Sequence, residues 1–128
     1  MPAKTQDKSG ISGILKLWLP VAACMGFIFY ASSIPGKNIP ALFVNQDIVF
    51  HISVYLLLAY FFSRALKNTY QDIAVVKLIL FTVIFGVIYG ITDELHQVFV
   101  PYRTISAWDV FNDGIGSLIG SLLYRWPR

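Results

Sequence analysis

The chain has 128 residues and a formal net charge of +3; 56% of its residues are hydrophobic and only 13% are charged. Soluble domains carry about 25% charged residues, so this chain has too few charges to cover a water-exposed surface. Together with a mean hydropathy of +0.64, these values exclude a disordered chain, a soluble nucleic-acid-binding protein and an ordinary cytosolic enzyme. The composition predicts one small integral membrane domain.

The chain has four apolar segments that are candidates for crossing a bilayer. A membrane-spanning helix needs about 20 residues. The four segments cover residues 14–31, 48–66, 73–92 and 106–124. We therefore predict an all-α membrane protein, a bundle of four transmembrane helices. Its domain covers residues 14–124, between an N-terminal tail of residues 1–13 and a C-terminal tail of residues 125–128.

The fourth segment has the lowest hydropathy, because its first half carries Asp109, Asn112 and Asp113. On a helix these three residues share one face with Gly116 and Gly120, at spacings of three and four. Apolar residues occupy most of the remaining surface, which would let the helix turn its polar face inward. A helix lying on the membrane surface is the alternative, although such helices usually carry Lys or Arg on their polar face.

The basic residues predict the orientation of the bundle, because cytoplasmic flanks of membrane helices carry the excess of Lys and Arg. With four crossings, eight of the ten fall on one side: Lys4, Lys8, Lys16, Arg64, Lys67, Lys77, Arg125 and Arg128. Only Lys37 and Arg103 fall on the other. We therefore expect a multi-pass protein of the cytoplasmic (inner) membrane with both termini in the cytoplasm. Nucleic acid is not an expected partner, whereas membrane lipids are.

Most of the remaining polar side chains fall near the outer ends of the predicted helices. Ionisable residues inside a membrane usually face a partner or a wet cavity, so we expect them to converge on one pocket. At single positions simpler interpretations stay open: Asp47 would be solvated at the interface or favour the helix dipole, and His51 would be a hydrogen-bonded interior group. The set is Asp47, His51, Tyr55, Asp93, Glu94, His96, Gln97, Arg103, Asp109, Asn112 and Asp113.

Within this set, His51, Glu94 and His96 are the candidate catalytic residues, because a histidine oriented by a carboxylate is a suitable general base. For Arg103 two interpretations stay open: a salt bridge to Asp93, Glu94 or Asp109, or a contact with an anionic phosphate or carboxylate of a ligand. The candidate ligand-binding residues are Asp47, Tyr55, Asp93, Gln97, Arg103, Asp109, Asn112 and Asp113. No cofactor is identified, but hard oxygen ligands for a divalent cation such as Mg²⁺ or Ca²⁺ come from Asp93, Glu94, Asp109 and Asn112.

Two pairs of glycines at a spacing of four are candidates for helix packing. Gly86 and Gly90 lie on the third segment, and Gly116 and Gly120 lie on the fourth. Such pairs let helix backbones approach closely. Close packing here would bring the polar end of the third helix against the polar start of the fourth.

Four groups of residues together match a known pattern. They are Ser32-Ser33-Ile34-Pro35; Asp47 with His51 and Tyr55; Tyr89-Gly90-Ile91-Thr92-Asp93-Glu94-Leu95-His96-Gln97; and Pro101-Tyr102-Arg103 followed by Asp109, Asn112, Gly116 and Gly120. As a set, they resemble the VanZ-like family of small membrane proteins over residues 18–123. The chain departs from that family where Asp47-Ile48 stands for Asp-Lys and where Pro101-Tyr102-Arg103 stands for Pro-Gly-Arg. The resemblance implies a role in the cell envelope, and for the family's namesake reduced susceptibility to teicoplanin, but no established reaction.

Two functions of different classes stay open. The first is a protein that binds an amphiphilic envelope lipid or a lipophilic glycopeptide through the polar pocket. The second is a membrane enzyme that modifies an envelope lipid or lipid-linked substrate by His/carboxylate acid–base or metal-assisted chemistry. Four short helices without a repeated half disfavour a self-contained transporter, whereas a subunit of a larger complex or an oligomer is compatible with the sequence.

Overall fold

The computed structural model describes residues 10–125, and within them the chain is all-α. Its elements are α1 (Ile11–Ser32), the short 3₁₀ helix η1 (Gly36–Asn38), α2 (Gln46–Thr69), α3 (Val75–Gln97) and α4 (Ala107–Arg125). The four predicted helices are present, and α3 continues beyond the apolar run through the polar Asp93–Gln97 turn. The tail residues Lys4, Lys8 and Arg128, used to predict orientation, lie outside the described residues.

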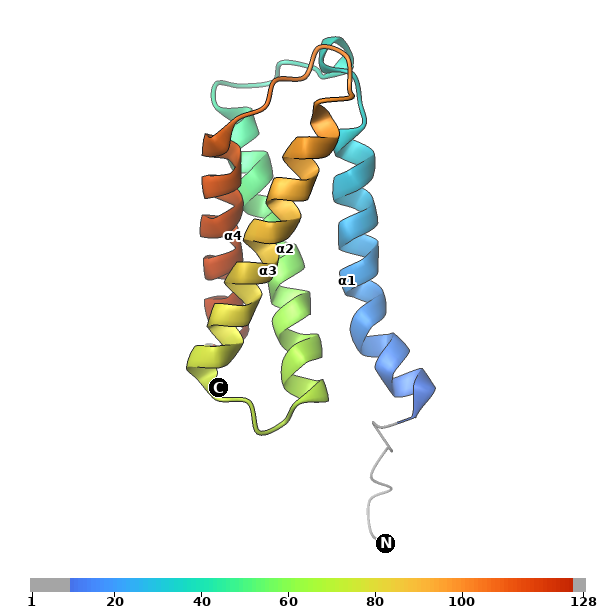
Figure 1. Ribbon diagram of the computed structural model, residues 1–128, viewed down its shortest axis with the longest axis vertical. Helices are drawn as coiled ribbons and strands as arrows, with labels where there is room; N and C mark the ends of the chain where they lie inside the picture. Colours follow the sequence, from blue (N-terminus) through green and yellow to red (C-terminus); the bar gives the residue numbers. More distant parts are fainter. Residues whose placement is uncertain (1–9, 126–128) are drawn as a thin grey trace, which may run out of the picture.

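Three of these helices, α1, α2 and α3, are long and apolar enough to cross a membrane. Helix α4 has 19 residues and carries Asp109, Asn112 and Asp113 in its first turns, which lowers its hydropathy. It nevertheless runs alongside α2 and α3 in the same bundle (Figure 1). Its polar residues Asn112 and Asp113 are buried, as the helical spacing predicted.

Helices α1 and α3 run in one direction and α2 and α4 in the other (Figure 1). Consequently the connections 33–45 and 98–106 lie at one end of the bundle. The 70–74 connection lies at the opposite end, together with the first and last described residues. We call the end with the two long connections the loop end, and every candidate site residue belongs to it.

The distribution of side chains is the reverse of that in a water-soluble domain. Large apolar side chains cover the outside; Leu19, Val76 and Phe99, for example, are 64%, 76% and 85% exposed. Among residues 10–125, eleven polar or charged side chains are buried, compared with nine hydrophobic ones. Soluble domains bury apolar groups instead, so this arrangement fits a chain whose surroundings are apolar.

The inner face of α4 is built from small residues, which brings its backbone against α2. A β-carbon added at Gly116 would overlap the carbonyl oxygen of Ile52, and one added at Gly120 would overlap that of Leu56. The partners advance together along both helices, so α2 and α4 are parallel. This close approach places the first turns of α2 and α4 side by side at the loop end.

The second glycine pair has a different neighbour. Gly86 and Gly90 of α3 face the side chains of Ser117 and Asp113 on α4. Helix α4 therefore lies between α2 and α3. The glycine pair on α3 lets α3 approach α4, whereas the glycine pair on α4 lets α4 approach α2. As a result, the polar ends of α2, α3 and α4 all meet.

Helix α1 is attached to α2 and α3 through aromatic side chains. The indole Nε1–H of Trp18 donates to the Thr69 hydroxyl of α2 at 3.2 Å, and the hydroxyl of Tyr89 donates to the Met25 carbonyl at 2.7 Å. At the loop end, α1 stands apart far enough to leave the cavity described below.

Candidate functional site

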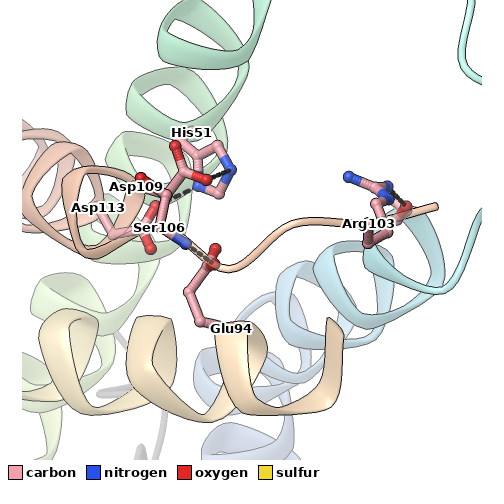
Figure 2. A network of polar contacts seen from close by, with 7 residues as sticks. His51, Glu94, Arg103, Ser106, Asp109 and Asp113 are labelled. Atoms are coloured by element: carbon pink, nitrogen blue, oxygen red, sulfur yellow. Dashed lines mark hydrogen bonds and ion pairs between the residues drawn. The ribbon is translucent and has the colours of Figure 1, made fainter. Parts of the chain in front are cut away.

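His51 in the second turn of α2 lies at the centre of the buried polar residues (Figure 2). Its Nδ1–H donates a 2.7 Å hydrogen bond to Oδ1 of Asp113, whose side chain is fully buried on α4. Its other ring nitrogen, Nε2, lies 3.8 Å from Oδ2 of Asp109, one turn before Asp113. One imidazole of α2 thus faces two carboxylates of α4.

Glu94 adds a third carboxylate from α3. Its Oε2 accepts a 3.1 Å hydrogen bond from the backbone N–H of Ser106, just before α4 begins. Its Oε1 is buried and has no hydrogen-bond partner among the described residues, and the same holds for Oδ2 of Asp113 and Nδ2 of Asn112. Buried polar groups normally have a hydrogen-bond partner. These three atoms are therefore available to bind a ligand or an ion.

We call His51, Glu94, Asp109 and Asp113 the His51 cluster. Nitrogen or oxygen atoms of His51, Glu94 and Asp109 lie within 4.8 Å of one another, close enough to hold one metal ion. Three carboxylates face one imidazole, so the cluster is electrostatically suited to a cation or to hydrogen-bond donors. Chemically, it offers both a His–Asp pair for proton transfer and a set of metal ligands.

A cavity of about 450 Å³ adjoins this cluster at the loop end, between the ends of α1 and α3, the 33–45 connection and the start of α2. Its walls are mainly apolar and include Ile28, Ile34, Ile39, Leu42, Phe43 and Val54. His51 lines it as well, so the imidazole is shared between cavity and cluster. We call this space the α1–α2 pocket.

Several predicted ligand-binding residues line the α1–α2 pocket. Asp93 and Gln97 reach it from the last turns of α3, and their side chains are otherwise buried, at 6% and 4% exposure. Tyr55 lines it one turn below His51, with its ring stacked at 6.4 Å on the imidazole and its hydroxyl buried without a partner among the described residues. Asp47 lies at the mouth, exposed in the first turn of α2.

Of the two interpretations left open for Arg103, the salt bridge to Asp93, Glu94 or Asp109 is not formed. The Nε of Arg103 donates to the carbonyl of Ile34 at 2.9 Å and its Nη2 to that of Ala31 at 2.7 Å, and it forms no ion pair with a described residue. Figure 2 shows it apart from the His51 cluster. The reason is the path of the 98–106 connection, which crosses to the end of α1, where helix-terminal carbonyls lack intrahelical partners. Its side chain still borders the α1–α2 pocket.

His96 also lies away from the His51 cluster. Its Nε2 forms a 2.9 Å hydrogen bond with the Ser33 hydroxyl, and its ring stacks on Phe29 at 4.3 Å. Two residues along a helix correspond to about 200° of rotation. Glu94 and His96 therefore point to different sides of α3, and His96 joins α3 to α1.

Sequence reasoning missed Gln46 and Ser106, which shape the site through backbone contacts. The side-chain Oε1 of Gln46 accepts from the backbone N–H of Leu42 at 2.7 Å, and its Nε2 donates to the backbone carbonyl of Pro40 at 2.8 Å. These bonds fold the loop that walls the α1–α2 pocket. The one signal in the sequence was a polar residue directly before Asp47 at a helix start.

Comparison with known proteins gives one finding. A family model described as VanZ/LLP1 matches residues 17–128. No curated protein and no solved structure shows a significant match. The matched range includes the whole His51 cluster and every residue that lines the α1–α2 pocket.

Proposed function

The chain belongs to the VanZ/LLP1 family, and on that premise we propose that this membrane protein binds an amphiphile in the α1–α2 pocket. The ligand is an envelope lipid or a lipophilic glycopeptide, in a role of teicoplanin-type resistance or envelope homeostasis. The observation that carries the proposal is the pocket itself, about 450 Å³ with apolar walls and with His51, Asp93 and Gln97 on its surface. Pockets for small ligands have volumes of about 300–1,000 Å³ and combine apolar walls with few polar groups.

The proposal includes four crossings of the cytoplasmic membrane, with α4 as the fourth. Support comes from the outward side of α4, where Phe111, Leu118 and Leu122 are 55%, 42% and 46% exposed, and from its place alongside α2. The bias of Lys and Arg toward the other end of the bundle orients the loop end away from the cytoplasm. A ligand in the outer leaflet would then be level with the α1–α2 pocket.

The polar groups of the pocket favour a head group that carries hydroxyl or amine donors. Asp93 and the side-chain oxygen of Gln97 are acceptors, and the carboxylates of the His51 cluster lie next to them. The donors Nε and Nη2 of Arg103 already bond to the carbonyls of Ile34 and Ala31, so Arg103 contributes mainly positive charge.

The test is photochemical cross-linking of the purified full-length protein to a phospholipid with a diazirine in its acyl chain. Val54→Trp fills the pocket and is expected to lower cross-linking at least fivefold. Leu57→Trp is the matched control, because Leu57 is 49% exposed on the same helix and does not line the pocket. Teicoplanin is added as competitor, and its displacement of the lipid would identify the glycopeptide class. Equal cross-linking of the two variants would contradict the proposal.

A second candidate, an enzyme acting on the bound amphiphile, is favoured by one observation. The Nδ1–H of His51 donates a hydrogen bond to the buried Asp113, and the imidazole also lines the α1–α2 pocket. This arrangement fixes the tautomer and would leave Nε2 to accept a proton from a hydroxyl of the ligand or from water. Lipid profiles of cells with the wild type and with His51→Gln distinguish the candidates. An enzyme gives a product that the variant lacks, whereas a binding protein changes no lipid covalently.

A further inference from the structure

We propose that His51, Glu94 and Asp109 bind one divalent cation of the first transition series, such as Zn²⁺ or Mn²⁺. The three residues come from α2, α3 and α4, and each directs one nitrogen or oxygen atom to a common point, with all three atoms within 4.8 Å of one another. The site goes beyond the amphiphile proposed for the α1–α2 pocket and does not depend on it.

The separation between His51 and Asp109 fits two ligands of one ion better than a direct contact. At 3.8 Å, Nε2 of His51 and Oδ2 of Asp109 are too far apart for a hydrogen bond. Metal–nitrogen and metal–oxygen bonds are about 2.0–2.2 Å long. Two ligands of the same ion therefore lie about 3–4 Å from each other, which is the separation found here.

Glu94 gives the second, independent observation. Its side chain is buried, with 3% of the residue exposed, and Oε1 has no hydrogen-bond partner among residues 10–125. The other oxygen, Oε2, is fixed by the Ser106 N–H, and the carboxylate points toward His51 and Asp109 (Figure 2). A buried carboxylate oxygen without a partner is costly, and a cation at this point would satisfy it.

The surroundings of His51 are those of a metal ligand. Histidines that bind metal through one ring nitrogen commonly donate the other N–H to a carboxylate, which fixes the ring. Asp113 is placed to do this, at 2.7 Å from Nδ1. Asp113 is thus a positioning residue, and the ligand itself is His51.

The ligand set indicates which class of ion fits. One imidazole with two carboxylates suits Zn²⁺ or Mn²⁺, whereas Mg²⁺ and Ca²⁺ prefer oxygen ligands alone. This differs from the oxygen-only set expected from the sequence, because His51 takes the place of Asp93 and Asn112. The Asp109 side chain is 20% exposed, which leaves a path to the site and room for a further ligand or water.

The test is metal binding by the full-length protein purified in detergent, stripped with chelator and then titrated with Zn²⁺ or Mn²⁺ in the absence of any amphiphile. We expect about one ion per chain by elemental analysis. Glu94→Gln and Asp109→Asn are expected to weaken binding about 10- to 100-fold. Asp72→Asn is the control, an exposed carboxylate in the 70–74 connection at the opposite end of the bundle, and it should change the affinity less than threefold.

A spectroscopic measurement on the wild type keeps the test independent of how well the variants fold. X-ray absorption of the Zn²⁺ complex is expected to show one imidazole nitrogen and oxygen ligands. A spectrum without imidazole, an undiminished affinity in both ligand variants, or saturable binding of only Mg²⁺ or Ca²⁺ would each overturn the assignment. Since no amphiphile is present, failure here leaves the cross-linking result untouched, and the reverse also holds.

Discussion

His51 and Asp113 form a buried 2.7 Å hydrogen bond between residues 62 positions apart in the chain. Both side chains are nearly inaccessible, at 9% and 0% exposure. The bond can form because Gly116, one turn after Asp113, lets the α4 backbone lie against α2. Helix packing and the candidate chemistry therefore depend on the same contact.

Replacing Asp113 by alanine is expected to destabilise the protein by about 1–3 kcal/mol, because it leaves the His51 Nδ1–H buried without an acceptor. The measurement is the thermal unfolding midpoint in detergent. Asp47→Ala is the control, since Asp47 is exposed at the start of α2 and surface changes usually stay within about 0.5 kcal/mol. Similar midpoints for the two variants would show that the His51–Asp113 contact contributes little.

Gly116→Ala and Gly120→Ala are each expected to cost about 1–3 kcal/mol, the usual range for overpacking. In both cases the added methyl group meets a backbone carbonyl of α2, which cannot move away as a flexible side chain can. Gly26→Ala on α1 is the control, because a β-carbon there has no neighbour within 4 Å. Thermal unfolding and the yield of folded protein measure the effect, and equal stability of the three variants would contradict the predicted α2–α4 contact.

The sequence predicts where a side chain points when the residue lies on a helix, because helical periodicity sets its direction. It does not do so for a residue in a loop. The spacing of Asp109, Asn112 and Asp113 placed them on one face of α4, and Asn112 and Asp113 are buried as that face requires. For Arg103 the direction follows from the path of a loop that pairs with the 33–45 connection, as in the 3.0 Å bond from the Gly36 N–H to the Pro101 carbonyl. Helical periodicity carries no information about such a path.

His96 illustrates the other limit. Its closeness to Glu94 in the sequence suggested one shared site, although an even spacing of two places residues on different sides of a helix. Periodicity shows that the two side chains diverge. It does not show that α1 supplies Ser33 and Phe29 as the partners of His96, because that depends on how α1 packs.

The proposed orientation predicts which loops are accessible from outside the cell. In a Cys24→Ser background, Thr104→Cys in the loop-end connection is expected to react with a membrane-impermeant maleimide in intact cells. Gln71→Cys, in the opposite connection, is the matched control and should react only after permeabilisation. Both positions are exposed, so access across the membrane decides the result. Labelling in the inverted pattern would reverse the orientation, and labelling of both positions from outside would contradict the four-crossing arrangement.

Tyr102 has a left-handed backbone conformation, with φ of 61°, where a side chain costs about 1–2 kcal/mol relative to glycine. This is the position at which the resemblance to VanZ-like proteins led us to expect Pro-Gly-Arg. Tyr102→Gly is therefore expected to stabilise the protein by up to about 1 kcal/mol. The gain stays below the full strain energy because the substitution also removes the contact of the Tyr102 ring with the Lys37 ammonium, which lies 5.3 Å from the ring centroid. Asn45→Gly is the matched control, because Asn45 also has φ of 61° but asparagine tolerates this conformation better, so its gain should be smaller. A thermal midpoint lowered by Tyr102→Gly would mean that the ring contacts outweigh the relief of backbone strain.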